Sequence, residues 1–193
     1  VSKRERYMRD YELSAYDAAL ITQSREWADY FEAAFDALGN AKGMTSAKQI
    51  ANWMTGELSA ALNRLEFTSD SPITDCPIAP QTLAQLVRRI QDGTLSGKLA
   101  KEVFTELWNE PLQSQSDTVD SIIAAKGLRQ LSDGGEIEII VDQVLAANAQ
   151  QIADFRAGKE KAFNSLVGQV MKASRGKANP QQVNDVLRRK LAQ

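Results

Sequence analysis

The side chains that usually carry out chemistry are scarce in this chain. Its 193 residues contain no histidine and a single cysteine, Cys76. A Ser-His-Asp triad, a Cys-His dyad or a His-ligated zinc therefore cannot be built from this chain alone. One cysteine also excludes an internal disulfide and a CxxC redox site. Asp and Glu together number 25, so composition leaves a carboxylate-based hydrolase or a Mg²⁺ site open.

Lysine and arginine gather beside glycines near the end of the chain. Residues 158–161 read Gly-Lys-Glu-Lys, and residues 172–177 read Lys-Ala-Ser-Arg-Gly-Lys. We expect both segments at helix junctions, where free N–H groups and a partial positive charge suit phosphate oxygens. Neighbouring cations add sequence-independent attraction to a nucleic-acid backbone. The candidate polyanion-binding residues are Arg156, Lys159, Lys161, Lys172, Arg175 and Lys177, with Arg188, Arg189 and Lys190 as a subordinate set.

The charges are divided unevenly along the chain. Residues 151–193 carry nine Lys or Arg and three acids, a net charge of +6, whereas the first 150 residues carry a net charge of −8. An acidic body with a basic end is typical of proteins whose end binds a polyanion. A basic helix surface that is only solvated has the same composition, so charge alone leaves both interpretations open.

Other suggestive motifs favour structural interpretations. Residues 93–98, Gly-Thr-Leu-Ser-Gly-Lys, lack the Ser or Thr after the lysine and the preceding strand of a phosphate-binding loop, so we expect an interhelical turn. Among Glu136, Glu138 and Asp142 only the last two share a helix face, which favours a solvated surface and no metal site. Trp27, Trp53 and Trp108 lie on apolar stripes and are expected in the core.

Helices must position these residues, because apolar side chains recur at helical spacing almost throughout. No pair of strands with a hairpin signal is present, and no apolar run approaches the roughly 18 residues of a membrane span. We predict an all-α fold of two consecutive helical units, a helical domain over residues 1–126 and a small basic helical bundle over residues 127–193. In the first unit we expect five helices: residues 14–38, a helix that a capping box opens at 46–49 and that runs to Leu65, Pro80 to Asp92, Ser96 to a stop at Pro111, and Asp117 to Gly127. In the second unit we expect a helix that Ser132 or Asp133 caps and that runs through Leu145. Three more helices should end near Gly158, before Gly176 and at the chain end, and the last of them should start at Asn179-Pro180.

The segment Asp154–Lys172 ends in Val-Gly-Gln-Val-Met-Lys and is continued by Gly-Lys-Ala-Asn-Pro at 176–180. These residues resemble the B subunit of the aspartyl/glutamyl-tRNA amidotransferase, the GatB/YqeY family, and they are the most diagnostic part of the resemblance. The resemblance covers essentially the whole chain in order. Its earlier segments are Tyr-Asp-Ala at 16–18, Ala-Asn-Trp at 51–53, Gly-Glu-Leu at 56–58, Ser-Gly-Lys-Leu-Ala-Lys-Glu-Val at 96–103, Lys-Gly-Leu at 126–128 and Leu-Ser-Asp at 131–133.

The resemblance implies a helical domain followed by a YqeY-like tail domain, without the catalytic cradle of the family. In the family the cradle uses ATP and Mg²⁺ to activate misacylated Glu-tRNA(Gln) or Asp-tRNA(Asn), and ammonia derived from glutamine arrives from the A subunit, a glutaminase. We therefore expect no catalytic residue, no metal site and no cofactor in this chain, which starts at Val1 and not at Met. The implied partners are tRNA and the A and C subunits in the cytoplasm, with neither DNA nor a membrane.

These observations favour a non-catalytic tRNA-binding appendage of an ATP-dependent amide ligase that serves protein biosynthesis. The six candidate polyanion-binding residues would then contact tRNA. A helical protein-interaction module, in which the basic end is only solvated, is the first alternative. A free-standing YqeY-like protein is the second, and the start at Val1 argues against it.

Overall fold

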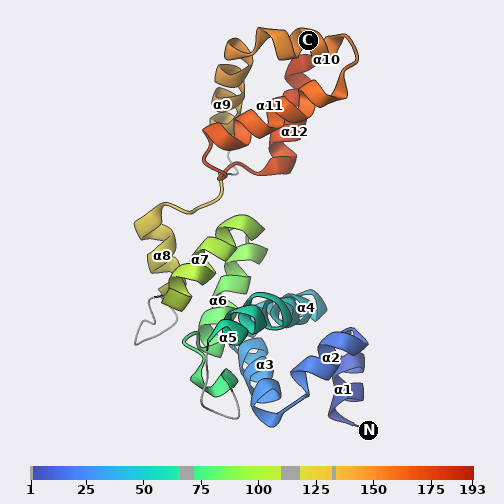
Figure 1. The fold of residues 1–193 in the computed structure, drawn as a ribbon, viewed down its shortest axis with the longest axis vertical. Helices are drawn as coiled ribbons and strands as arrows, with labels where there is room; N and C mark the ends of the chain where they lie inside the picture. Colours follow the sequence, from blue (N-terminus) through green and yellow to red (C-terminus); the bar gives the residue numbers. More distant parts are fainter. Residues whose placement is uncertain (1, 66–71, 110–117, 132–133) are drawn as a thin grey trace. The chain divides into compact units, whose positions relative to one another are not determined.

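The fold is taken from a computed structural model that describes residues 2–65, 72–109, 118–131 and 134–193. Within these ranges the secondary structure is helical, apart from an isolated parallel bridge between Leu131 and Ala178 (Figure 1). The all-α prediction is therefore confirmed. No helix in the described ranges is long and apolar enough to cross a bilayer.

The chain divides into two compact units. The first unit comprises Val1–Asp92 and Val103–Ile122, and the second comprises Gly93–Glu102 and Ile123–Gln193. Compactness does not test whether a segment folds alone, so the domain boundary between residues 126 and 127 stays a prediction.

The first unit is built around the packing of two long helices, α3 and α6. Its fully buried side chains include Phe31, Leu38, Ile50 and Leu83. Its elements are α1 (Lys3–Asp10), α2 (Ala15–Ile21), α3 (Arg25–Ala37), η1 (Gly39–Ala41), α4 (Met44–Trp53), η2 (Met54–Leu58), α5 (Ser59–Arg64), η3 (Pro72–Asp75), α6 (Pro80–Gln91), and parts of α7 (Gly97–Asn109) and α8 (Thr118–Lys126).

The single helix predicted over residues 14–38 is wrong, because the chain breaks at residues 22–24. Ser14 caps α2, and the Ser24 hydroxyl accepts a hydrogen bond from the Trp27 amide at the start of α3. A serine that can cap offers the backbone an alternative to continuing the helix, and the apolar spacing does not register such a break.

The capping box predicted at residues 46–49 is also wrong. Helix α4 already begins at Met44, and Ser46 is buried inside it. The Ser46 hydroxyl donates to the Ala41 carbonyl at 2.6 Å and accepts from the Gln91 amide at 2.7 Å. The Ser46 hydroxyl is thus bonded to Ala41 and Gln91 inside a helix that has already begun, so Ser46 does not cap α4.

The tryptophans are not equally buried. Trp27 is 8% exposed, as the core prediction requires. Trp53 and Trp108 are half-buried and flank the ring of Phe104, with ring centroids 5.6 Å and 6.0 Å away. The core interpretation is therefore right for Trp27 and incomplete for the other two.

The second unit contains a helical bundle of α9 (Gly134–Ala147), α10 (Ala149–Arg156), α11 (Glu160–Ala173) and α12 (Pro180–Leu191). Figure 1 shows these helices packed around a shared centre, where Ile137, Leu166, Val183 and Leu187 are buried. The Asn179 side chain accepts from two backbone amides at the start of α12, as predicted. The predicted boundary residues Pro111, Asp117, Ser132 and Asp133 lie outside the described residues.

Candidate nucleic-acid interface

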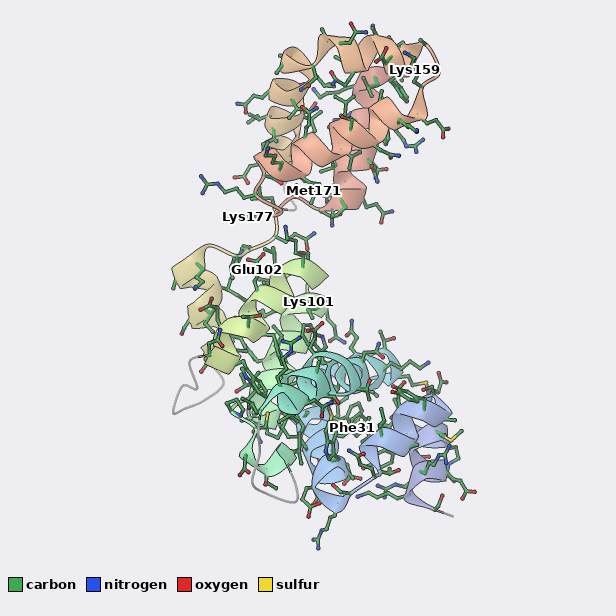
Figure 2. The ribbon with its side chains drawn as sticks, viewed as in Figure 1. Phe31, Lys101, Glu102, Lys159, Met171 and Lys177 are labelled. Carbon is green, nitrogen blue, oxygen red and sulfur yellow. The ribbon has the colours of Figure 1, made fainter. Side chains whose placement is uncertain are left out.

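The six predicted residues form two separate groups at the ends of α11. Arg156, Lys159 and Lys161 lie at the α10–α11 junction, whereas Lys172, Arg175 and Lys177 lie at the α11–α12 junction. A helix of 14 residues is about 20 Å long. Lys159 and Lys177 accordingly stand at opposite ends of the bundle (Figure 2).

At the α10–α11 junction the positive charge is partly compensated. The Lys159 ammonium donates to the Asp154 carboxylate at 3.1 Å, and the Gln150 amide donates to the same carboxylate oxygen. These hydrogen bonds, chiefly the one from Lys159, hold the pKa of Asp154 below its ordinary value. Lys159 is therefore engaged within its own junction, while Arg156 and Lys161 are exposed.

The backbone of the α11–α12 junction forms a Schellman motif. The Arg175 amide donates to the Lys172 carbonyl at 3.0 Å, and the Gly176 amide donates to the Met171 carbonyl at 2.8 Å. Arg175 has a φ of 56°, in the left-handed region where glycine is usual. Holding a side chain there costs roughly 1–2 kcal/mol, so the arginine is kept at this exposed turn against a local penalty.

A fourth cation, Lys98, joins this junction from the start of α7, within the same compact unit. Its ammonium lies 2.8 Å from the point that a Cβ on Gly176 would occupy, so the approach depends on the missing side chain. Backbone hydrogen bonds from Gln130 to Thr94 and from Leu131 to Lys177 tie the surrounding segments together. The predicted turn is confirmed for residues 93–96, whereas Gly97 and Lys98 already belong to α7. The sequence interpretation overlooked Lys98 as a cation of this junction.

The cations at the α11–α12 junction are not matched by carboxylates. Within the part of the chain that the structure describes, no ion pair involves Lys98, Lys172, Arg175 or Lys177. Lys172 and Arg175 are exposed, and Lys177 is half-buried. This junction can therefore offer its full positive charge to an external anion.

The subordinate cations of α12 are engaged within the bundle. Arg189 lies 3.2 Å from Glu138, and Lys190 lies 3.0 Å from Glu138 and 2.6 Å from Asp142, so these pairs fasten α12 to α9. The Arg188 guanidinium sits 5.0 Å from the centre of the Phe163 ring. Because these contacts occupy the three side chains, the α11–α12 junction is the stronger candidate site.

These features define a class of protein: an all-helical chain with an acidic body and a helical bundle that concentrates uncompensated cations at one junction. Residues 29–191 match the family model described as the GatB domain, and the chain belongs to this family. The resemblance seen in the sequence is thus confirmed.

Curated relatives support the same assignment. The chain is 56% identical over 188 residues to the B subunit of the aspartyl/glutamyl-tRNA(Asn/Gln) amidotransferase of Thiobacillus denitrificans, with 97% of this chain and 36% of the relative covered. It is 52% identical to the protein of the same name from Aromatoleum aromaticum, with 97% of this chain and 37% of the relative covered. It is also 52% identical to the protein of the same name from Dechloromonas aromatica, with 100% of this chain and 37% of the relative covered. The chain therefore spans little more than a third of the length of these relatives.

Proposed function

We propose that this chain is a non-catalytic, tRNA-binding part of the B subunit of an amidotransferase. The observation that carries the proposal is the set of unpaired cations at the α11–α12 junction: Lys98, Lys172, Arg175 and Lys177. Folded RNA is recognised largely through phosphates, 2′-hydroxyls and shape. A turn that brings together three lysines and one arginine suits this kind of recognition, because binding to phosphates needs no base-specific contact.

The larger protein would act as an ATP-dependent amide ligase. It would convert misacylated Glu-tRNA(Gln) or Asp-tRNA(Asn) with glutamine-derived ammonia, together with the A and C subunits in the cytoplasm. Among the described residues no three His, Cys, Asp or Glu side chains gather in a way that could hold a metal ion. From the resemblance to the family we assign ATP and Mg²⁺ to parts of the larger protein outside this chain, and tRNA binding to this chain.

The test is a tRNA titration at several salt concentrations with a variant carrying Lys172→Glu, Arg175→Glu and Lys177→Glu. Affinity falls as salt rises, and each lost phosphate contact makes the slope of log affinity against log salt less steep by about 0.7–0.9. The loss of three contacts should therefore make the slope less steep by roughly 2–3. The matched control carries Lys3→Glu, Arg25→Glu and Lys48→Glu. It changes the net charge equally, but at cations that already lie beside carboxylates in the first unit.

We expect the junction variant to lose affinity and salt dependence while the control keeps most of both. If both variants lost affinity and salt dependence equally, the loss would follow from net charge alone, and the junction would not be part of the interface. Retention of the chain by the A and C subunits, with no affinity for tRNA, would favour the protein-interaction module instead.

A further inference from the structure

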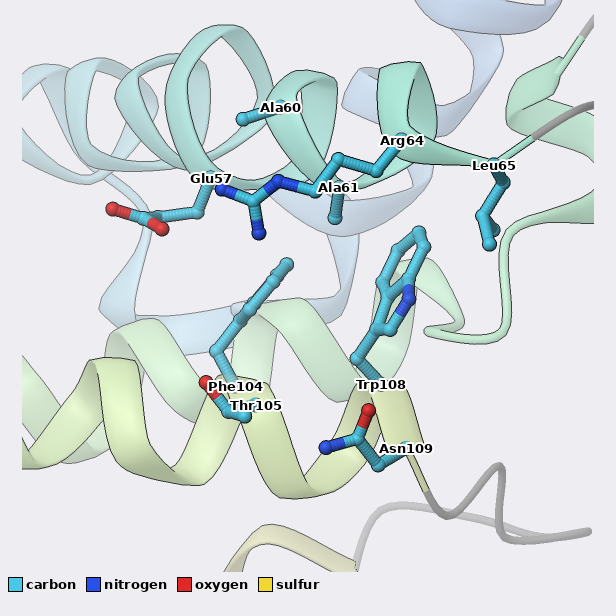
Figure 3. A pocket seen from close by; sticks show the side chains of 9 residues that line it. All are labelled: Glu57, Ala60, Ala61, Arg64, Leu65, Phe104, Thr105, Trp108 and Asn109. Atoms are coloured by element: carbon cyan, nitrogen blue, oxygen red, sulfur yellow. The ribbon is translucent and has the colours of Figure 1, made fainter.

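The first unit contains a pocket that the tRNA-backbone proposal does not use. Its volume is about 270 Å³, and it lies between the segment Glu57–Leu65 and the C-terminal half of α7. Figure 3 shows Glu57, Ala60 and Arg64 on one side and Phe104, Trp108 and Asn109 on the other. All of these residues belong to the first unit.

One wall of the pocket is the end of an aromatic stack. The rings of Phe104 and Trp108 are stacked, with centroids 6.0 Å apart and planes 21° apart, and Trp53 packs on Phe104 from elsewhere in the unit. Phe104 is buried, whereas Trp108 is half-buried and extends its indole ring into the pocket (Figure 3). A further flat ring could therefore continue the stack at this point.

The polar side chains of the pocket suit a neutral ring better than a bare anion. Arg64 and Glu57 carry opposite charges, so their formal sum is zero, and Asn109 adds an amide that can both donate and accept. Arg64 forms no ion pair within the described part of the chain. Its guanidinium folds back along α5 above the Phe104 ring in Figure 3 and remains able to bind a phosphate beside the ring.

The backbone supplies an independent indication that the pocket has a function. The helix that forms its upper side contains a π turn, Met54–Leu58, and Glu57 belongs to that turn. Such turns insert an extra residue into an α-helix and occur frequently at functional sites. The insertion changes the face that the following residues present, and the small side chain of Ala61 points into the space between Phe104 and Trp108 (Figure 3).

We propose that this pocket binds an unpaired nucleobase of an RNA strand, stacked on Trp108, with Arg64 on the adjacent phosphate. The volume lies just below the usual range for small-molecule pockets, about 300–1,000 Å³, and suits one ring system. The choice of RNA over other aromatic ligands rests on the proposed function. The pocket itself is separate from the α11–α12 junction, because the two lie in different compact units.

The test measures quenching of tryptophan fluorescence by a single-stranded GAGA tetranucleotide and by guanosine monophosphate. The chain has three tryptophans, Trp27, Trp53 and Trp108, all in the first unit, so the signal does not report on the basic bundle. We expect the tetranucleotide to quench and to bind more tightly than the mononucleotide, because an internal base of the strand has a phosphate on either side that Arg64 can bind, whereas the mononucleotide has one.

Ala61→Leu puts a larger side chain that favours helix between Phe104 and Trp108, and Asn63→Leu places the same side chain on an exposed position of α5 outside the pocket. Stacking of a base on an aromatic side chain typically changes affinity by roughly 5- to 150-fold. We expect a loss in this range for Ala61→Leu and none for Asn63→Leu, while circular dichroism shows that both variants keep their helices.

Absent quenching, or equal behaviour of the two leucine variants, overturns the proposal. Equal affinity for the mononucleotide and the tetranucleotide would show that the ligand of the pocket is a free nucleotide, and it would overturn the proposal that the bound base belongs to an RNA strand. If Ala61→Leu released a partner protein and left quenching unchanged, the pocket would be a protein-docking site. Because the junction variant of the previous section keeps the pocket intact, failure of tRNA-backbone binding and failure of base binding are distinguishable.

Discussion

Replacing Arg175 with glycine should raise stability and lower RNA affinity at the same time. Arg175 occupies the left-handed position of the Schellman motif that ends α11, with a φ of 56°, and it is exposed. Glycine is the usual residue at that position because it has no Cβ to collide with the following carbonyl. Arg175→Gly therefore relieves strain, and it removes one of the unpaired cations proposed to bind phosphate.

The expected gain in stability follows from two opposing terms. Relief of the left-handed strain contributes roughly 1–2 kcal/mol, and the greater freedom of glycine in the unfolded chain takes back about 0.5–1 kcal/mol. At the midpoints of these two ranges the net gain is about 0.8 kcal/mol. For a chain of 193 residues this corresponds to a rise in melting temperature of roughly 1–4 °C.

The assay combines thermal unfolding, followed by circular dichroism, with the tRNA titration at varied salt. The matched control is Lys172→Gly, because Lys172 is exposed and lies in the last turn of the same helix. Glycine in a helix interior costs roughly 0.5–1 kcal/mol, so the melting temperature of the control should fall below that of the parent. The control loses one cation, as Arg175→Gly does, so the two variants differ only in the sign of their effect on stability. Both variants should lower the salt slope by about 0.7–0.9.

Two results would refute this reasoning. A melting temperature that falls in Arg175→Gly would show that the arginine side chain stabilises the turn by more than the strain it causes. An unchanged tRNA affinity and salt slope would show that the strained arginine does not serve RNA binding, and the residue would then need another explanation.

Two further predictions concern the first unit. Asp120 accepts two hydrogen bonds from Arg89, at 2.6 and 2.7 Å, which hold the pKa of its carboxyl below the ordinary value. The stabilisation from this pair is present above the unfolded pKa of about 3.9 and is lost as pH falls through the lower folded value. Urea unfolding should therefore show Asp120→Asn less stable than the parent at pH 7, and the difference should shrink as the pH is lowered below about 3.9. A difference that stays constant with pH would contradict the pairing. Burial raises the pKa of the Cys76 thiol to about 11 from an ordinary value of 9.0, so its reaction with Ellman's reagent at pH 7.5 should be roughly 100-fold slower in the folded protein than in urea, and equal rates would show an accessible thiolate.

The sequence predicted the helices well where short-range chemistry decides their ends. Asn179-Pro180 begins α12 and Pro80 begins α6 as expected, because a capping side chain and a proline act within one turn. The capping box at Ser46 failed because its hydroxyl is taken by Ala41 and by Gln91, a residue 45 positions away. Local pattern alone cannot reveal such a competitor.

The candidate site was less predictable than the fold, because ion pairing depends on which helices meet. The spacing of Glu138 and Asp142 indicated a shared face, but their pairing with Arg189 and Lys190 requires α9 to lie against α12. The π turn at Met54–Leu58, which shapes the aromatic pocket, has no signature in the apolar spacing. Lys98 was passed over because it lies beside Gly176, a residue far away in the sequence.

The net charge of the basic end is therefore a poor measure of what a ligand encounters. Of its nine cations, Lys159, Arg189 and Lys190 are engaged by carboxylates within the bundle. Lys98, which the count over residues 151–193 omits, adds a charge at the α11–α12 junction. The packing of the helices decides which cations are left without a carboxylate partner. Removing Glu138 or Asp142 should therefore leave Arg189 or Lys190 on α12 without that partner, but it should not add a cation to the α11–α12 junction. Affinity should then follow the junction residues and not the overall charge, which is why the equal-charge control is the decisive comparison.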